Sequence, residues 1–228
     1  ENYDSWLSFL RTIKSRGLDD VMLVVSDAHK GLKRAISEVF QGAAWQRCVV
    51  HLMRDCIRAA GSRKASRRVS RILAPVFRLK EAGAVRVAYH LAIEMLEGFC
   101  KDAAHILEEA EADALAYLDF PATHWKRLRT NNIQERTNRE IKRRSRVVQV
   151  FPSTKSLERL AGAVMCDQDE LWSDARYFSV IRMTELYDML DKTSQKVEIT
   201  KERLGEWEAV AKRAIEASLA LADEMEAA

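Results

Sequence analysis

Hydrophobic residues along the chain recur at two different spacings, and the changes of spacing predict the elements. Residues 4–16 carry apolar side chains every three or four positions, which predicts an amphipathic helix. The unbroken apolar run at 21–25 predicts a short strand buried on both faces, and residues 31–40 return to helical spacing. A second strand is predicted at 45–50. Helix, strand, helix and strand in this order are typical of a layered α/β unit.

The pattern becomes helical throughout after the second strand. Alanine, leucine and charged residues dominate residues 51–119, which predicts an all-helical insertion that Phe120 and Pro121 close. Further helices are predicted at residues 129–146, 157–171, 181–190 and 199–226. Residues 147–151 either finish the first of these helices or are extended. The predicted fold is an α/β unit with a large helical insertion and a helical tail.

Charge is unevenly distributed along a chain whose formal net charge is only +3. Residues 126–146 hold nine basic side chains against two acidic ones, and residues 58–80 hold eight against none. From residue 198 onward, eight acids face four bases. Basic patches on a nearly neutral protein predict a polyanionic partner such as nucleic acid.

The cysteines and the apolar runs bound the class of protein. The four cysteines are scattered and form no C-x-x-C pair, which is typical of reduced thiols in a cytosolic protein. No apolar run approaches the roughly 18 residues that a membrane helix needs, so no membrane partner is expected.

The basic segment at 129–146 also holds two acids, Glu135 and Glu140. Helical periodicity places Asn131, Glu135 and Lys142 on one face, together with Asn138. An acid within so much positive charge indicates a metal-binding carboxylate beside a phosphate-binding surface. The alternative is a solvated helix on which Glu135 makes an ordinary i,i+4 pair with Arg139.

Asp27 follows the first predicted strand, at the carboxyl end where α/β sheets bind ligands. Its alternative role is to cap the helix that follows. Carboxylates such as Asp27 and Glu135 are the ligands that Mg²⁺ prefers, and two such ions clamp the attacking and leaving oxygens of a phosphodiester. Such a site usually needs three or more carboxylates, and these residues supply two.

Two further features of the sequence have competing interpretations. Cys48 and His51 form a C-x-x-H pair that supplies two metal ligands, but a structural zinc needs two more, and packing or a local hydrogen bond is the alternative. Trp125 either stacks on a nucleobase or anchors a helix to the core, and the core is favoured.

Three blocks of the sequence resemble the Mutator-type transposases of bacterial insertion sequences. The blocks are VVSDAHKGL at 24–32, WQRCVVHLMRD at 45–55 and TNNIQERTNREIKRRSRVVQVFPS at 130–153, with DELW and RYFS near 169–179. They occur in the order that the family shows, and the resemblance covers residues 1–190.

The resemblance implies a DDE transposase with an RNase H-like fold and a helical insertion before the last acid. Asp27 matches the second acid and Glu135 the third, in an N-x-x-E-R-x-N pattern, while Cys48 and His51 match a family signature of unsettled role. The implied segments are a partial catalytic core at 1–50 without its first strands, the insertion at 51–119, the rest of the core at 120–192 and an acidic tail at 193–228.

The resemblance also implies the chemistry and the partners. Two Mg²⁺ ions, or Mn²⁺, support hydrolysis at the transposon ends and joining of the freed 3′-hydroxyl to target DNA. A homo-oligomer on DNA is expected, in the bacterial cytoplasm at the nucleoid. The residues expected to contact DNA phosphates are Arg136, Asn138, Arg139, Lys142, Arg143 and Arg144.

The first acid of the family's triad lies on a strand upstream of the helix at 4–16. Asp4, Asp19 and Asp20 are badly placed to replace it, since they lie at a helix start or at the far end of the first strand. The sequence therefore predicts a C-terminal piece of a transposase that is inactive alone. The alternatives are a non-catalytic DNA-binding or dimerising regulator of transposition and a helical scaffold.

Overall fold

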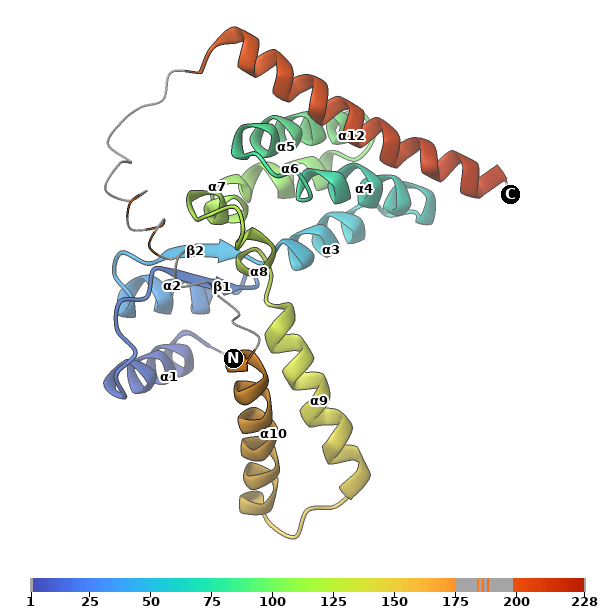
Figure 1. The fold of residues 1–228 in the computed structure, drawn as a ribbon. Coiled ribbons are helices and arrows are strands. Elements are labelled where there is room, and N and C mark those ends of the chain that lie inside the picture. The colour runs from blue at the N-terminus through green and yellow to red at the C-terminus, as the bar shows by residue number, and fades with distance from the viewer. Residues whose placement is uncertain (1, 175–183, 185, 187, 189–198, 228) are drawn as a thin grey trace.

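A computed structural model of the chain describes residues 2–174, 184, 186, 188 and 199–227 (Figure 1). Its first part contains α1 (Tyr3–Ser15), β1 (Leu23–Ser26), α2 (Lys30–Val39) and β2 (Ala44–Arg47). The strands are parallel, with Leu23 opposite Ala44 and Ser26 opposite Arg47, and α2 forms the crossover between them. The α/β order predicted from the hydrophobic spacing is confirmed.

A small core lies where α1 and α2 pack on the sheet. Leu10, Ile36 and Phe40 are buried there, and Trp45 of β2 packs against them. The prediction that β1 is buried on both faces is wrong, because Leu23 to Val25 are only half-buried. Within the described residues, β1 pairs with a single strand, and so one of its edges has no neighbouring strand.

The insertion is helical throughout, as predicted. It consists of α3 (Val49–Ala59), α4 (Arg63–Val76), α5 (Ala82–Glu97), α6 (Lys101–Glu109), α7 (Glu111–Ala114) and the 3₁₀ helix η1 (Ala116–Asp119). Its core includes the fully buried Leu52, Ile72, Leu73, Leu96 and Leu107. Each such side chain contributes about 1.5–3 kcal/mol through burial.

A buried amide fastens the end of the insertion to the sheet. Gln46 of β2 is fully buried, and its Nε2 donates to the carbonyl of Ala114 at 2.8 Å. Its Oε1 accepts a hydrogen bond of 2.8 Å from the backbone N–H of Tyr117. Because an unpaired amide here would cost about 1–3 kcal/mol, these bonds fix where the chain returns to the sheet.

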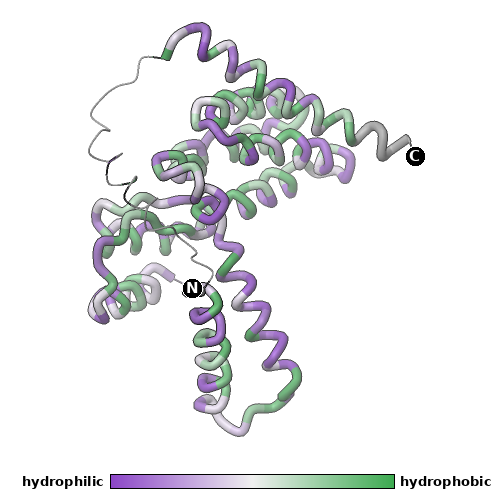
Figure 2. The backbone as a smooth tube through the Cα atoms, viewed as in Figure 1, coloured by the Kyte–Doolittle hydropathy of each residue, from purple (hydrophilic) through white to green (hydrophobic). Residues whose placement is uncertain are grey.

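After the insertion come α8 (Trp125–Leu128), α9 (Asn132–Val148) and α10 (Thr154–Asp174). Helices α9 and α10 pack on each other and project from the rest as a hairpin (Figure 1). Figure 2 shows that α9 is hydrophilic along most of its length, in keeping with its basic sequence. Residues 147 and 148 finish α9. The helix predicted at 181–190 lies mostly outside the described residues.

Trp125 belongs to the core, as predicted. Its side chain is 6% exposed, and its Nε1 donates to the carbonyl of Phe120 at 2.6 Å. Its ring meets Tyr117 edge to face, with the ring centroids 5.5 Å apart. This residue therefore anchors α8 to the insertion.

The tail forms a single long helix, α12 (Lys201–Ala227), which packs along α4 and α5. Ala211 and Ile215 are buried in the core of the insertion. Trp207 lies over Gly83 of α5, and its Nε1 donates to Glu81 at 2.9 Å. In the described part of the chain, no helix is both long and apolar enough to cross a membrane.

Candidate active site

The carboxyl ends of β1 and β2 lie side by side. The backbone N–H of Cys48, just after β2, donates to the carbonyl of Ser26 at 2.7 Å, and Asp27 follows Ser26. Asp27 is exposed, and within the described residues its carboxylate makes no hydrogen bond or ion pair. The cap of α2 is His29, whose Nδ1 accepts from the N–H of Leu32 at 3.1 Å. The carboxylate of Asp27 therefore faces solvent at the sheet edge and does not cap α2.

The prediction that β2 extends to residue 50 is wrong, because β2 ends at Arg47 and α3 begins at Val49. Cys48 is the residue before α3, and its carbonyl accepts from the N–H of Leu52 at 3.0 Å. The C-x-x-H pair thus opens a helix instead of ending a strand. His51 and Arg54 lie three residues apart on this helix, so they share a face.

Two hydrogen bonds join the start of α3 to the start of α9. The buried Sγ of Cys48 donates to Oδ1 of Asn131 at 3.0 Å, across 83 positions of sequence. The backbone N–H of Val49 donates to the carbonyl of Arg129 at 3.0 Å. Asn131 is the N-cap residue of α9, and therefore these bonds set where α9 begins.

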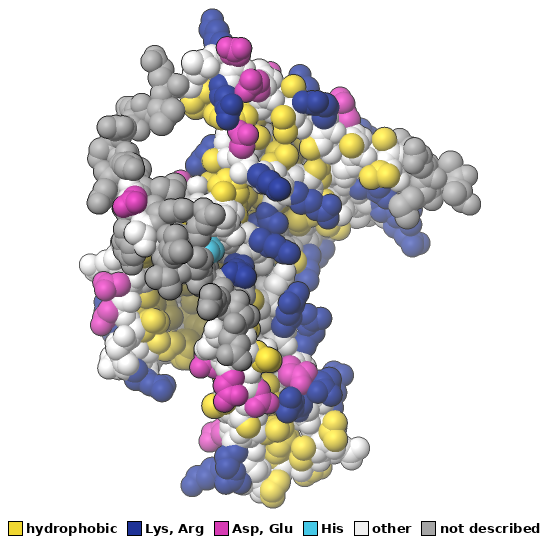
Figure 3. Space-filling view, in the orientation of Figure 1, with side chains coloured by type: hydrophobic (Ala, Val, Ile, Leu, Met, Phe, Trp, Pro, Cys, Tyr) yellow, Lys and Arg dark blue, Asp and Glu magenta, His cyan; other side chains and the backbone are white. Residues whose placement is uncertain are grey.

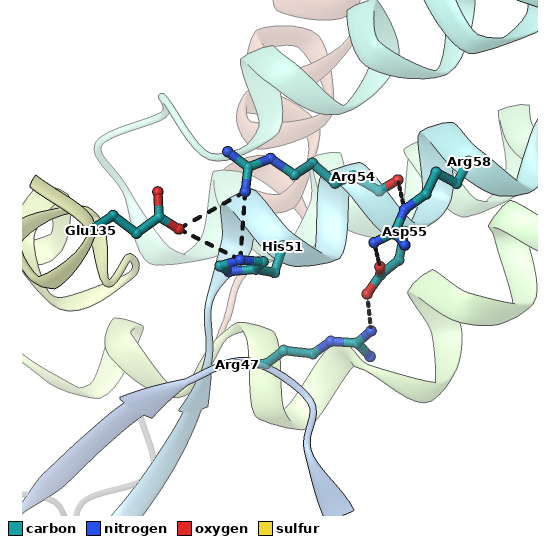
Figure 4. Close-up of polar contacts among 6 residues, drawn as sticks. All are labelled: Arg47, His51, Arg54, Asp55, Arg58 and Glu135. Carbon is teal, nitrogen blue, oxygen red and sulfur yellow. Dashed lines mark hydrogen bonds and ion pairs between the residues drawn. The ribbon is translucent and has the colours of Figure 1, made fainter. Parts of the chain in front are cut away.

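Glu135 lies one turn into α9 and faces α3 (Figure 4). Its Oε1 lies 3.5 Å from Nε2 of His51 and 3.9 Å from Nη1 of Arg54. The i,i+4 pair with Arg139 is not among the ion pairs of the described residues. These contacts are longer than the 2.7–2.9 Å of a tight charge-assisted hydrogen bond, so the carboxylate can exchange them for another ligand.

A second set of ion pairs holds α3 against β2 (Figure 4). Nη2 of Arg47 lies 2.9 Å from one oxygen of Asp55, and Nη2 of Arg58 lies 2.6 Å from the other. Since Arg47 ends β2, this network fixes the direction of α3 relative to the sheet edge.

The outer part of α9 carries the predicted DNA-binding residues. Glu140 accepts hydrogen bonds from Arg143 and Arg144 at 2.8–2.9 Å, which hold the pKa of Glu140 down at about 2. Asn138 is exposed on the same helix. Three of the predicted DNA-binding cations on α9 have no ion pair within the described part of the chain, namely Arg136, Arg139 and Lys142.

Asp27 and Glu135 suit a hard cation by their chemistry, because Mg²⁺ takes carboxylate oxygens. The buried Nδ1 of His51, beside Glu135, has no hydrogen-bond partner, so the polar groups here are not all satisfied within the protein. Among the described residues, no group of three or more His, Cys, Asp or Glu side chains gathers at one point. The described residues therefore form no complete metal site, and no hydrogen bond or ion pair among them joins Asp27 to Glu135.

Sequence reasoning missed the partners of these residues. Arg54 lies one turn beyond His51, and a helix starting at Cys48 would have placed both on one face. Asn131 and Glu135 were grouped correctly by helical periodicity. The sequence held no signal for the bond between Asn131 and Cys48.

A sequence model of the Mutator family of transposases matches residues 1–175, and the chain belongs to that family. It is similar to three curated insertion-sequence transposases. The IS1081 transposase of Mycobacterium tuberculosis is 37% identical over 178 residues, which are 78% of this chain and 43% of that protein. The IS256 transposase of transposon Tn4001 from Staphylococcus aureus is 33% identical over 75% of this chain and 44% of its own length.

The ISRM5 transposase of Rhizobium meliloti is 35% identical over 81% of this chain and 46% of its own length. The chain therefore spans less than half of the length of these relatives. The resemblance drawn from the three sequence blocks is confirmed.

Proposed function

We propose that this chain contributes two of the three acids of a DDE-type active site that cuts DNA at the ends of an insertion sequence. The observation that carries the proposal is the docking of Glu135 against α3, because Cys48, the residue before α3, is hydrogen-bonded to the strand end that precedes Asp27. The topology of two parallel strands and a helical insertion before Glu135 agrees with part of an RNase H-like core.

Asp27 and Glu135 act as the ligands of Mg²⁺ or Mn²⁺ in this proposal. When two such ions are bound, they stabilise the attacking and leaving oxygens of the phosphodiester. Asp27 contributes an exposed carboxylate that needs no rearrangement. Glu135 contributes the oxygen that now lies 3.5 Å from His51, and that imidazole and Arg54 keep the carboxylate directed toward the start of α3.

The basic face of α9 binds the DNA backbone. Arg136, Arg139 and Lys142 are exposed and meet phosphates directly, while Asn138 donates from its amide. Arg143 and Arg144 share Glu140 and therefore present less net charge. Such contacts position the duplex without reading its sequence, and assembly as a homo-oligomer on DNA is a further prediction that sedimentation with and without duplex checks.

Cys48 and His51 act as positioning residues and not as a zinc pair. Cys48 fixes the first residue of α9 through Asn131, and His51 contacts the carboxylate one turn later. The Cys48–Asn131 hydrogen bond thus fixes the start of α9, and the His51 contact orients Glu135.

Cutting of the polypeptide by a bound metal ion shows where that ion lies, so it tests the proposal without an assay of transposition. Fe²⁺ replaces Mg²⁺, and ascorbate with peroxide then cuts the polypeptide beside the ion. We expect fragments ending near residues 27 and 135, lost in Asp27→Asn and Glu135→Gln. Glu140→Gln is the matched control, because Glu140 lies on the same helix but binds Arg143 and Arg144. Cuts elsewhere, or cuts unchanged in both variants, would refute the assignment.

A regulator of transposition is the second candidate function. Two carboxylates bind such ions less tightly than three and leave the ligand set incomplete, so we expect the chain to bind duplex DNA but to nick it weakly in Mg²⁺ or Mn²⁺. The packing of α12 on the insertion leaves the basic face of α9 open to DNA. Co-expression with a complete relative should then depress transposition, and rapid nicking that depends on Asp27 and Glu135 would instead favour an enzyme.

A further inference from the structure

A cavity of about 480 Å³ lies between the first turns of α9 and the insertion, and Asn132, Ile133 and Arg136 of α9 line it. Its walls come from α3, from the end of α4, from α8 and from the first turns of α9. Five basic side chains line it, and none of the described residues that line it is acidic. These five residues are Arg78, Lys126, Arg127, Arg129 and Arg136.

Four of these cations lack an acidic partner. Within the described residues, Arg78, Lys126, Arg129 and Arg136 make no ion pair, whereas Arg47 at the end of β2 is paired with Asp55. Burial lowers the pKa of Arg129, and the nearby charge of Arg78 lowers it further. Guanidinium groups that repel each other in a partly buried site are stabilised when an anion binds between them.

The floor of the cavity is apolar. This floor consists of Val49, Val50 and Met53 of α3 with Ala74 of α4 and Phe77. Inorganic phosphate would leave this apolar surface uncovered. The volume falls in the range of about 300–1,000 Å³ typical of pockets for small organic ligands. A ligand with an anionic end and a less polar body fits both surfaces.

We propose that this cavity holds one nucleotide of a DNA strand, with its phosphate on the cations and its sugar and base on the apolar floor. The inference deepens the proposed function and rests on it. Arg136 lines the cavity and directly follows Glu135 on α9, so a strand seated here contacts the same turn of the helix that carries this acid. Figure 3 shows Lys and Arg side chains in a band from the insertion onto α9, along which the strand continues.

The insertion gains a role in this arrangement. Arg78 and Phe77 directly follow α4, and both line the cavity opposite α9. The helical insertion therefore forms one wall of the strand path next to the catalytic residues. Arg78, near the end of the basic run at 58–80, thus meets the start of the basic run at 126–146.

Fluorescence anisotropy tests the proposal. It measures the binding of a labelled single strand and of a labelled duplex over a range of salt concentrations. The double variant Arg78→Ala/Lys126→Ala removes two exposed cations, so the fold should survive, which circular dichroism checks. We expect affinity to fall about tenfold and the slope of log K against log salt to decrease by about two. Arg16→Ala/Lys201→Ala is the control, since both residues are exposed and lie outside the cavity, and it should change affinity less than twofold.

The outcomes separate the inference from the proposed function. If the unaltered chain binds no DNA, both fail. If Arg139→Ala/Lys142→Ala weakens binding while the cavity variant behaves like its control, only the cavity assignment is overturned. A thermal shift with a deoxynucleoside monophosphate should exceed that with inorganic phosphate at equal concentration, and equal shifts would overturn the nucleotide assignment. Equal binding of an RNA strand, with the same loss in the variant, would overturn the assignment to DNA.

Discussion

Gly83 provides a sensitive test of how the tail helix packs. A Cβ added at this residue would lie closer than 3.0 Å to Cη2, Cζ2 and Cζ3 of Trp207. The indole ring cannot move aside cheaply, because its Nε1 donates to Glu81 at 2.9 Å and because Ala211 and Ile215 hold α12 in the core. Gly83→Ala should therefore push α12 away from α5.

The magnitude follows from two opposed effects. Replacing a helical glycine by alanine stabilises a helix by about 0.5–1 kcal/mol where space allows. Overpacking a tight contact costs about 1–3 kcal/mol. We expect Gly83→Ala to lower the free energy of unfolding by roughly 1 kcal/mol. In a Trp207→Ala background the contact is gone, so the same substitution should raise the free energy by about 0.5–1 kcal/mol.

Urea unfolding, monitored by circular dichroism, measures the change in the free energy of unfolding in each background. Gly98→Ala is the matched control, because its nearest neighbour would be the carbonyl oxygen of Met95 at an ordinary 3.6 Å. Its effect should be the same in both backgrounds. If Gly83→Ala stabilises the chain equally with and without Trp207, α12 does not lie on α5 as described, and the reasoning is refuted.

Three further predictions concern the site and the core. Cys48→Ala should speed hydrogen exchange in the first two turns of α9 several-fold, while Cys48→Ser, which keeps a donor, should not; equal effects would contradict the positioning role. Burial raises the pKa of Cys56 from 9.0 to about 12 and that of Tyr117 from 10.0 to about 12. Both groups stay protonated in the folded chain while they ionise in the unfolded chain. The contribution of these two groups to the free energy of unfolding should thus be constant below about pH 9 and fall steadily from there to about pH 12. Urea unfolding at constant salt over this pH range measures the change. A free energy that does not change with pH would show that these groups are not buried. Glu140→Gln frees Arg143 from its ion pair and leaves Arg144 with only Asp167, at 3.6 Å, so DNA affinity measured by anisotropy should rise a few-fold, whereas a loss would contradict the placement of Glu140.

The hydrophobic spacing predicted most elements of this fold, because local periodicity reports which side of an element is buried. It failed at Val49 and Val50, where two β-branched residues after β2 favour a strand. There the N–H of Val49 bonds to the carbonyl of Arg129, far away in the sequence, and this tertiary contact lets α3 begin. Propensity is a weak prior that such contacts override.

The candidate site was predicted in part for the same reason. Helical periodicity grouped Asn131 with Glu135 because both lie on one helix. The bond from Cys48 to Asn131 joins two elements 83 positions apart, and a single sequence carries no sign of it. The cavity could not be predicted either, because charge counts along the chain do not show that Arg78 and Lys126 line the same cavity.

The hairpin of α9 and α10 has a mechanical consequence. Helix α9 contains neither glycine nor proline and is fastened at Asn131, so it acts as a stiff lever with its pivot there. At 1.5 Å per residue, Arg146 lies about 22 Å from the pivot and Glu135 about 6 Å. A tilt of about ten degrees moves the far end by about 4 Å and the carboxylate by about 1 Å. A displacement at the far end of α9 is thus reduced about fourfold at Glu135, the acid that we propose binds metal.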